Sequence, residues 1–359
     1  MAKRRQRPAA LLLYALSVAV FVEGASRLML RSEWFLKSGI RESNVYFRLN
    51  WVERHRKGME IARRFDAYHP TRGWTLVPGL RDLRGGQGET VSSNSRGVRG
   101  QREYATEKPA GVQRIVVVGD SFSFGEEASD EETYAYLLEQ RLPNTEVINL
   151  AVHGYGHDQM LITLREAGMQ YHPDIVLLGF LMTDMVRNTL AFRDYAKPRF
   201  ELRGNELELR DSPVPAPETV MRAEPWRLYT LDVFRLFYES FEWRSGRLKR
   251  RMDELTLAIL DEMVRTTKGA NAIPLFVYLP ERGELQADPN TPSWGERFLL
   301  PYCGSRAVRC LSVRAAFVAA AARGQSLYGK YHFSAAGHAV VANEVQRYLA
   351  EGIAAPPRK

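Results

Sequence analysis

The stretch "RIVVVGDSFSFG", residues 114–125, decides the fold expected of this chain, because an apolar run leads directly into a Gly-Asp-Ser turn. A short run of β-branched residues that ends at turn residues is typical of a buried strand. Four further apolar runs follow along the chain, at residues 147–152, 175–181, 273–279 and, more weakly, 308–313. We therefore expect a parallel sheet of about five strands.

Helical patterns alternate with these runs. They are "DEETYAYLLEQRL" (130–142), "DQMLITLREAG" (158–168), "DELTLAILDEMVRTTKG" (253–269) and "SAAGHAVVANEVQRYLAEG" (334–352). The first opens with acids and ends at Arg141 before Pro143, which are start and stop signals of a helix. Strands that alternate with helices predict a three-layer α/β/α domain.

Residues 190–250 interrupt this alternation. "RFELRGNELELR" reads as a hairpin about a Gly-Asn turn, and an aromatic stretch, "WRLYTLDVFRLFYESFEW", follows it. We interpret the segment as an insertion, either a flap or wall beside the site or a surface embellishment.

The chain begins with a basic cluster (Lys3, Arg4, Arg5 and Arg7) and an apolar run from Pro8 to Val22. That run is shorter than the roughly 20 residues of a spanning helix, although "EGASRLML" extends it if Glu23 lies at the interface. For residues 1–30 we expect an uncleaved membrane anchor rather than a cleaved signal, and a buried helix is the third option. Either of the first two places the main domain on the extracytoplasmic side.

Residues 31–110 carry many turn residues and predict an irregular arm that wraps a neighbouring core. The whole chain has 359 residues, 45% of them hydrophobic, and a net charge of +8. Beyond the first residues its positive side chains are mixed with acids, which disfavours a nucleic-acid partner. The two cysteines, Cys303 and Cys310, predict a disulfide, with two free thiols as the alternative.

Ser121 follows the first predicted strand, where ligands of a parallel α/β sheet bind. Here the stretch resembles the SGNH (GDSL-type) hydrolase family, over roughly residues 114–349 of the predicted 111–352 domain. The resemblance implies that Ser121 is the nucleophile and that His332, in "YGKYHFSAAGHAVV", is the general base. It further implies an oxyanion hole formed by Ser121, by Gly154 in "VINLAVHGYGHDQ", and by Thr183 in "GFLMTDMVRN".

Two positions depart from the family pattern. Thr183 stands where the family usually has an asparagine, and Gly329 stands where an aspartate would orient the histidine. Three explanations stay open: a backbone carbonyl orients His332, another acid such as Asp288 does, or the protein is no hydrolase. Asp120 and Asp184 are possible supporting residues, and His338 is expected to pack at the start of the last helix.

The sequence thus predicts a serine esterase or O-acyltransferase that acts on an acylated small molecule or polysaccharide outside the cytoplasm. A weak or inactive relative that binds glycans or envelope-assembly partners is the alternative. No metal or organic cofactor is expected. His153 and His157 are four residues apart, but we do not interpret them as a metal pair because they flank glycines in a loop.

Overall fold

A five-stranded parallel sheet forms the centre of the computed structural model, which describes residues 6–38, 43–204, 206–288 and 291–352. Its strands are β5 (Gln113–Val118), β6 (Thr145–Asn149), β7 (Ile175–Phe180), β10 (Ile273–Tyr278) and β11 (Arg309–Ser312). They lie in the order β11-β10-β7-β5-β6. All five predicted strands are present, so the expected sheet is confirmed.

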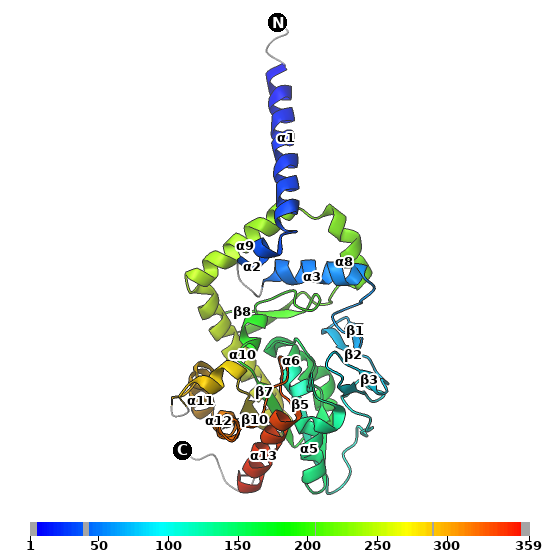
Figure 1. Ribbon diagram of the computed structural model, residues 1–359, viewed down its shortest axis with the longest axis vertical. Coiled ribbons are helices and arrows are strands. Elements are labelled where there is room, and N and C mark those ends of the chain that lie inside the picture. Colours follow the sequence, from blue (N-terminus) through cyan, green and yellow to red (C-terminus); the bar gives the residue numbers. More distant parts are fainter. Residues whose placement is uncertain (1–5, 39–42, 205, 289–290, 353–359) are drawn as a thin grey trace.

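Alternate residues of each strand point to opposite faces and build two separate cores. On one face Val116, Val118 and Ile148 pack with α6 (His157–Thr163), α10 (Arg247–Gly269) and α11 (Trp294–Arg306). On the other, Ile115 and Val117 pack with α5 (Tyr134–Arg141), α12 (Arg314–Ala322) and α13 (Ala335–Gly352). This is the predicted three-layer α/β/α architecture (Figure 1).

The strand order places a switch point at the centre of the sheet. Numbered from β5, the order is 2-1-3-4-5, so the chain leaves β5 toward β6 on one side and returns to β7 on the other. Ligands of open α/β sheets bind beyond the carboxyl ends of the strands at such a point. Short helices α4 (Ser121–Phe124) and α7 (Asp184–Arg187) begin there, after β5 and β7.

The segment 31–110 is more regular than expected. It forms α2 (Glu33–Ser38), α3 (Asn44–Arg56) and the short strands β1 (Asp66–His69), β2 (Gly73–Leu76), β3 (Leu83–Arg84) and β4 (Thr90–Val91). The expectation of an irregular arm misses α3, which Ser43 caps by accepting a hydrogen bond from the Tyr46 amide. Fully buried Trp51 and Trp74 pack the segment onto the α6–α10 face.

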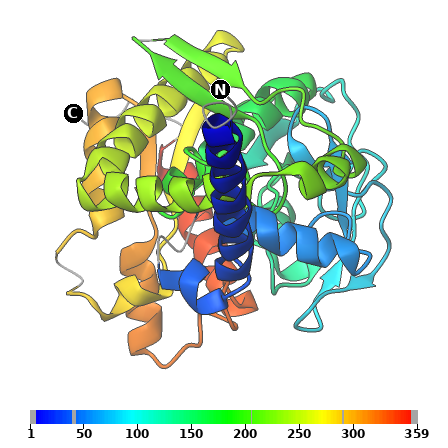
Figure 2. The same ribbon diagram turned by 90° about the horizontal axis from the view of Figure 1, so that it is seen from above.

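The insertion contains the expected hairpin, β8 (Arg199–Arg203) and β9 (Glu206–Arg210), although Asn205 of its turn lies outside the described residues. Two helices follow, α8 (Pro217–Ala223) and α9 (Tyr229–Arg244). Its first residues lie beside the loop after β6, where Asp194 approaches Gly154 and His153. Its later part, α9, packs against α1 instead (Figures 1 and 2).

Helix α1 (Gln6–Met29) projects from the rest of the molecule (Figure 1). Within it, residues Ala9–Met29 are long and apolar enough to cross a membrane, with a mean hydropathy of 1.8 and 6% of the window buried. A signal sequence has the same properties, so both expectations stay open. Lys3, Arg4 and Arg5 of the basic cluster lie outside the described residues.

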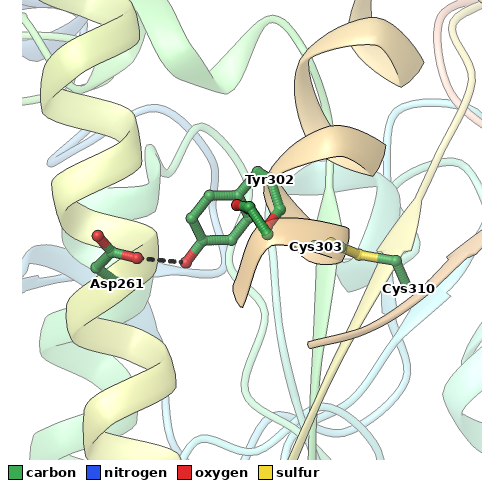
Figure 3. Close-up of a disulfide and its surroundings, with 5 residues drawn as sticks. Asp261, Tyr302, Cys303 and Cys310 are labelled. Carbon is green, nitrogen blue, oxygen red and sulfur yellow. Dashed lines mark hydrogen bonds between the residues drawn. A yellow bond between two sulfur atoms is a disulfide. The ribbon is translucent and has the colours of Figure 1, made fainter. Parts of the chain in front are cut away.

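The predicted disulfide between Cys303 and Cys310 is present and joins α11 to the edge strand β11 (Figure 3). The adjacent Tyr302 hydroxyl donates a hydrogen bond of 3.0 Å to Asp261 of α10. The edge strand is therefore fastened to the helical layer beside it.

Candidate active site

Ser121 is the first residue of α4 and lies directly beyond β5. Asp120 caps this helix, because its Oδ1 accepts a hydrogen bond of 3.0 Å from the Phe122 amide. The Ser121 hydroxyl donates to Asp120 Oδ2 at 3.3 Å, and the side chain is 5% exposed. The serine thus sits at a helix N-terminus, where free amides favour developing negative charge.

Three strand ends converge through Arg187 of α7. Its guanidinium donates to Asp120 Oδ2 after β5 (3.3 Å), to the Tyr155 carbonyl after β6 (3.1 Å) and to Asp184 Oδ1 after β7 (2.5 Å). Asp120 and Asp184 are fully buried. Arg187 therefore holds the loop after β5, which carries Ser121, against the loops after β6 and β7. Asp120 and Asp184 support this arrangement by accepting its hydrogen bonds.

Gly154 lies in the loop after β6 with a φ of +74°, a conformation that favours glycine. A Cβ at this position would lie 2.0 Å from Asp194 Oδ2, so no other residue fits without movement. Among the hydrogen bonds of the described residues, neither the Gly154 amide nor the Ser121 amide has an acceptor. Both amides are therefore free to serve as donors to a ligand.

Thr183 follows β7, at the place where the resemblance expects an oxyanion donor, but its hydroxyl donates to the Glu281 carboxylate. Burial raises the pKa of Glu281, and Glu284 and Asp120 add to this shift. Thr183 is thus engaged with an acid that follows β10, which the sequence did not predict.

His332 lies on the loop before α13, with its imidazole packed edge-on against the Phe122 ring at a centroid distance of 5.1 Å. Its side chain is 16% exposed, and its Nε2 lies 3.8 Å from Glu126. The imidazole therefore lies next to Phe122, the residue that follows Ser121. In the described part of the chain there is no hydrogen bond between Ser121 and His332 themselves.

Glu127 places a carboxylate beside His332 that the motif blocks did not predict. Its carboxylate lies 3.3 Å from His332 Nδ1 and accepts hydrogen bonds from the Lys330 and Tyr331 amides. A Cβ built on Gly329 would lie 2.4 Å from Glu127 Oε2. The Glu127 carboxylate thus fills the space that a side chain at position 329 would occupy.

Asp288, the acid suggested from sequence, lies elsewhere. It accepts a hydrogen bond from Thr291 in the loop before α11, and its carbonyl accepts one from Arg314. The signal for Glu127 was present as two consecutive glutamates, Glu126 and Glu127, shortly after the serine, but their contact with residue 332 is a tertiary one.

Three other histidines, His338, His157 and His153, are buried and held by their neighbours. His338 packs in the first turn of α13, as expected, and its Nδ1 accepts a hydrogen bond from the Tyr134 amide. Burial lowers the pKa of His338 to about 3. Burial also lowers the pKa of His157, which stacks on Phe180, to about 3. His153 is bound differently, between two carboxylates.

The His153 Nε2 lies 2.5 Å from Asp66 and its Nδ1 lies 3.5 Å from Asp194. Burial alone would lower the pKa of His153, but the two carboxylates raise it to about 9. The protonated imidazole holds the loop that carries Gly154, so its role is to position that loop.

Comparison with known proteins gave matches among solved structures alone, since neither a protein-family model nor a curated protein matches the chain. TesA is 16% identical, with 67% of this chain and 99% of that chain covered and a TM-score of 0.40. The esterase EstA from Pseudoalteromonas sp. is 15% identical, with 67% of this chain and 97% of that chain covered and a TM-score of 0.39. A lipolytic G-D-S-L family member from Veillonella parvula is 11% identical, with 67% of this chain and 99% of that chain covered and a TM-score of 0.41.

These scores support no conclusion about activity, which has to come from the site itself. The strand order is flavodoxin-like, and the four sequence blocks lie beyond the carboxyl ends of β5, β6 and β7 and before α13. The strand order and the placement of these blocks are those of the flavodoxin-like α/β/α fold that the sequence resemblance implies.

Proposed function

We propose that this protein is a serine esterase in which Ser121, His332 and Glu127 form the catalytic triad. The observation that carries the proposal is the contact of Glu127 with His332 Nδ1, in the space left open by Gly329. A general base needs a partner that holds its ring and stabilises its protonated form. Glu127 meets that need without an acid at position 329.

In the proposed reaction, the Ser121 oxygen attacks the acyl carbon while His332 Nε2 takes the hydroxyl proton. The resulting oxyanion accepts hydrogen bonds from the free amides of Ser121 and Gly154. His332 then returns the proton to the leaving alcohol, which leaves an acyl-serine. Water attacks this ester with His332 as base, and the acid and free Ser121 are released; a second alcohol in place of water gives transfer.

One hydrogen bond has to break and a new one has to form for this reaction. The Ser121 hydroxyl must leave Asp120, to which it donates at 3.3 Å, and turn toward His332. This bond is long, so its loss costs little compared with a well-formed one. Catalytic hydrogen bonds of ligand-free sites often form only when the substrate is bound.

Thr183 can act as a third oxyanion donor only if its hydroxyl leaves Glu281. Removal of one oxyanion donor lowers turnover by about 10²–10³ in an enzyme where it was tested. We therefore propose that Ser121 and Gly154 supply the main donors and that turnover is slow.

We further propose that α1 anchors the protein in a membrane and that the substrate is an O-acylated carbohydrate or other envelope component outside the cytoplasm. The exposed apolar surface of α1 supports the anchor. The resemblance supports the substrate class by analogy of fold.

Covalent labelling by a fluorophosphonate tests the reaction. We expect the full-length protein to be labelled, Ser121→Ala to lose labelling completely, and His332→Ala to be labelled more slowly. Ser123→Ala is the matched control, because Ser123 is a buried serine of the same helix and should leave labelling intact. Folded wild-type protein that is unlabelled at every pH would favour the alternative, a binding protein for glycans or envelope partners.

A further inference from the structure

The exposed face of α9 is unusual for a helix next to water, because it is aromatic. Large apolar side chains recur at helical spacing along it, and Trp226 just before it is 86% exposed. We define the apolar rim as these residues together with Trp34 of α2: Trp34, Trp226, Leu228, Leu231, Phe234, Phe237, Tyr238 and Phe241. Contiguous exposed apolar patches mark interaction surfaces.

The buried face of α9 holds two acidic side chains beside apolar Leu236, which packs in a cluster with Leu30 and Val45. Asp232 is 2% exposed and pairs with Arg48 of α3, and Glu242 is 5% exposed and pairs with Arg251 of α10. An exposed helix face lined with large aromatic side chains is uncommon on a soluble monomer and marks a surface that another apolar layer covers. The burial pattern therefore indicates a covering layer.

Contacts at the base of α1 indicate what that layer is. The Glu23 carboxylate accepts hydrogen bonds from the Tyr229 and Thr230 amides and so caps the N-terminus of α9. Arg27 donates to the Arg227 carbonyl and lies over the Tyr229 ring, 4.4 Å from its centroid. The apolar rim is thus fixed to the end of the helix proposed as the anchor (Figures 1 and 2).

The chemistry of the rim fits a bilayer surface. Tryptophan and tyrosine concentrate at membrane interfaces, and interfacial helices combine an apolar face with cationic residues. Exposed arginines flank the rim: Arg31, Arg235, Arg244 and Arg247. These positive charges are placed to meet phosphate groups of anionic lipids.

We propose that α9 and the apolar rim lie in the interface of the same membrane that α1 enters, so that the catalytic domain rests on the lipid surface. The proposal rests on the anchor suggested under the proposed function, and the test separates the two. It also explains Glu23: the carboxylate that interrupts the apolar run is satisfied by α9, which marks the level of the interface.

The test uses full-length protein in vesicles of phosphatidylethanolamine and phosphatidylglycerol. Both native cysteines form the disulfide, so one introduced cysteine can be labelled with an environment-sensitive fluorophore. The positions are Phe234→Cys for the rim, Leu16→Cys for the anchor, and Tyr136→Cys of α5 as the control outside both. All three side chains are exposed, so the substitutions leave the core unchanged.

We expect nitroxide lipids to quench the fluorophore at positions 234 and 16 and to leave position 136 unquenched. Quenching at 16 without quenching at 234 would overturn the proposal and keep the anchor. Quenching at 234 without 16 would keep the rim on the membrane and remove the anchor. A label at 234 that is shielded from aqueous iodide but not quenched by lipid would overturn the proposal in favour of a protein partner or a second copy.

Discussion

Glu127 and Gly329 act as a complementary pair at the candidate site. The backbone of Glu127 has a φ of +70°, and its carboxylate reaches the loop 329–332 from the segment that carries Ser121. Gly329 leaves open the volume that this carboxylate fills. In the proposed triad, the carboxylate beside His332 therefore comes from position 127 and fills the space that a side chain at position 329 would occupy.

This pairing predicts a non-additive result. Glu127→Gly should lower kcat by about 10²–10⁴ with little change in KM, because the base loses its partner while the rest of the site stays. Glycine also suits the positive φ at this position. The double variant Glu127→Gly with Gly329→Asp should regain most of the lost kcat, since an aspartate then enters the vacated space.

Gly329→Asp alone should be poorly active and less stable than wild type, because its Cβ and its charge would meet Glu127. Steady-state ester hydrolysis by the four proteins of this cycle measures the coupling. Equal losses in the double variant and in Glu127→Gly would show that Glu127 does not orient His332.

The residue scale is also where sequence reasoning failed. Ser121 and Gly154 come from motif blocks at strand ends and His332 from the block before the last helix, so their places in the fold could be predicted. Glu127 could not, because its contact with His332 depends on how two distant loops pack and on a positive φ that glutamate rarely adopts. The suggestion of Asp288 shows that a missing acid alone does not identify its replacement.

Among the elements, the carboxyl ends of β5, β6 and β7 form one unit through Arg187. All three bonds come from Nη1, and a lysine carries its ammonium on a flexible stem without the rigid guanidinium that holds this nitrogen in place. A buried arginine with a comparable role lies at the other end of the sheet: Arg114 at the start of β5 donates to Glu146 and to the Tyr171 carbonyl. The two arginines make a matched pair.

We predict that Arg187→Lys and Arg114→Lys each lower the free energy of unfolding by about 1–3 kcal/mol. Only Arg187→Lys should also slow fluorophosphonate labelling per folded molecule, because it loosens the loops around Ser121. Chemical denaturation and labelling rates of both variants check this. Similar labelling rates for the two variants would mean that Arg187 serves stability alone.

At this scale the sequence predicted the five strands, the hairpin and the helices after β5 and before the C-terminus, because their periodicity and capping signals are strong. It missed α3 and the helical form of α9. In α9 two acids are buried while most of the aromatic side chains are exposed, so the pattern is not typical of a helix that packs on a soluble core.

Over the whole molecule, His153 joins three parts of the chain that are distant in sequence. Asp66 belongs to the N-terminal segment, Asp194 to the insertion, and His153 to the loop after β6. Arg63 and Glu126 also face this cluster, because Arg63 pairs with Glu126 and both influence its charges. The packing of the N-terminal segment and of the insertion on the sheet is therefore coupled to the protonation of His153.

The sign of this coupling follows from the pKa. The pKa of His153 is raised from 6.5 to about 9 in the folded protein, so its contribution to stability is complete below pH 6.5 and is lost as the pH rises toward 9. We predict that His153→Gln lowers the Tm strongly at pH 6.5 and much less at pH 9.5. Thermal unfolding of both proteins across this range checks it, and a constant difference in Tm would contradict the proposed charge.

One consequence of the Glu127 contact concerns chimeras between this protein and others of the same architecture. The proposed nucleophile, Ser121, and the proposed acid, Glu127, both lie within residues 120–127, whereas the proposed base, His332, comes from a distant part of the chain. Exchange of the 120–127 segment would import both groups together, or remove both. Exchange of the last third of the chain would bring in a second acid if the other protein carries an aspartate at the position of Gly329. That aspartate and Glu127 would then compete for the same space. Recombination within this architecture therefore has to treat the two segments as a linked pair.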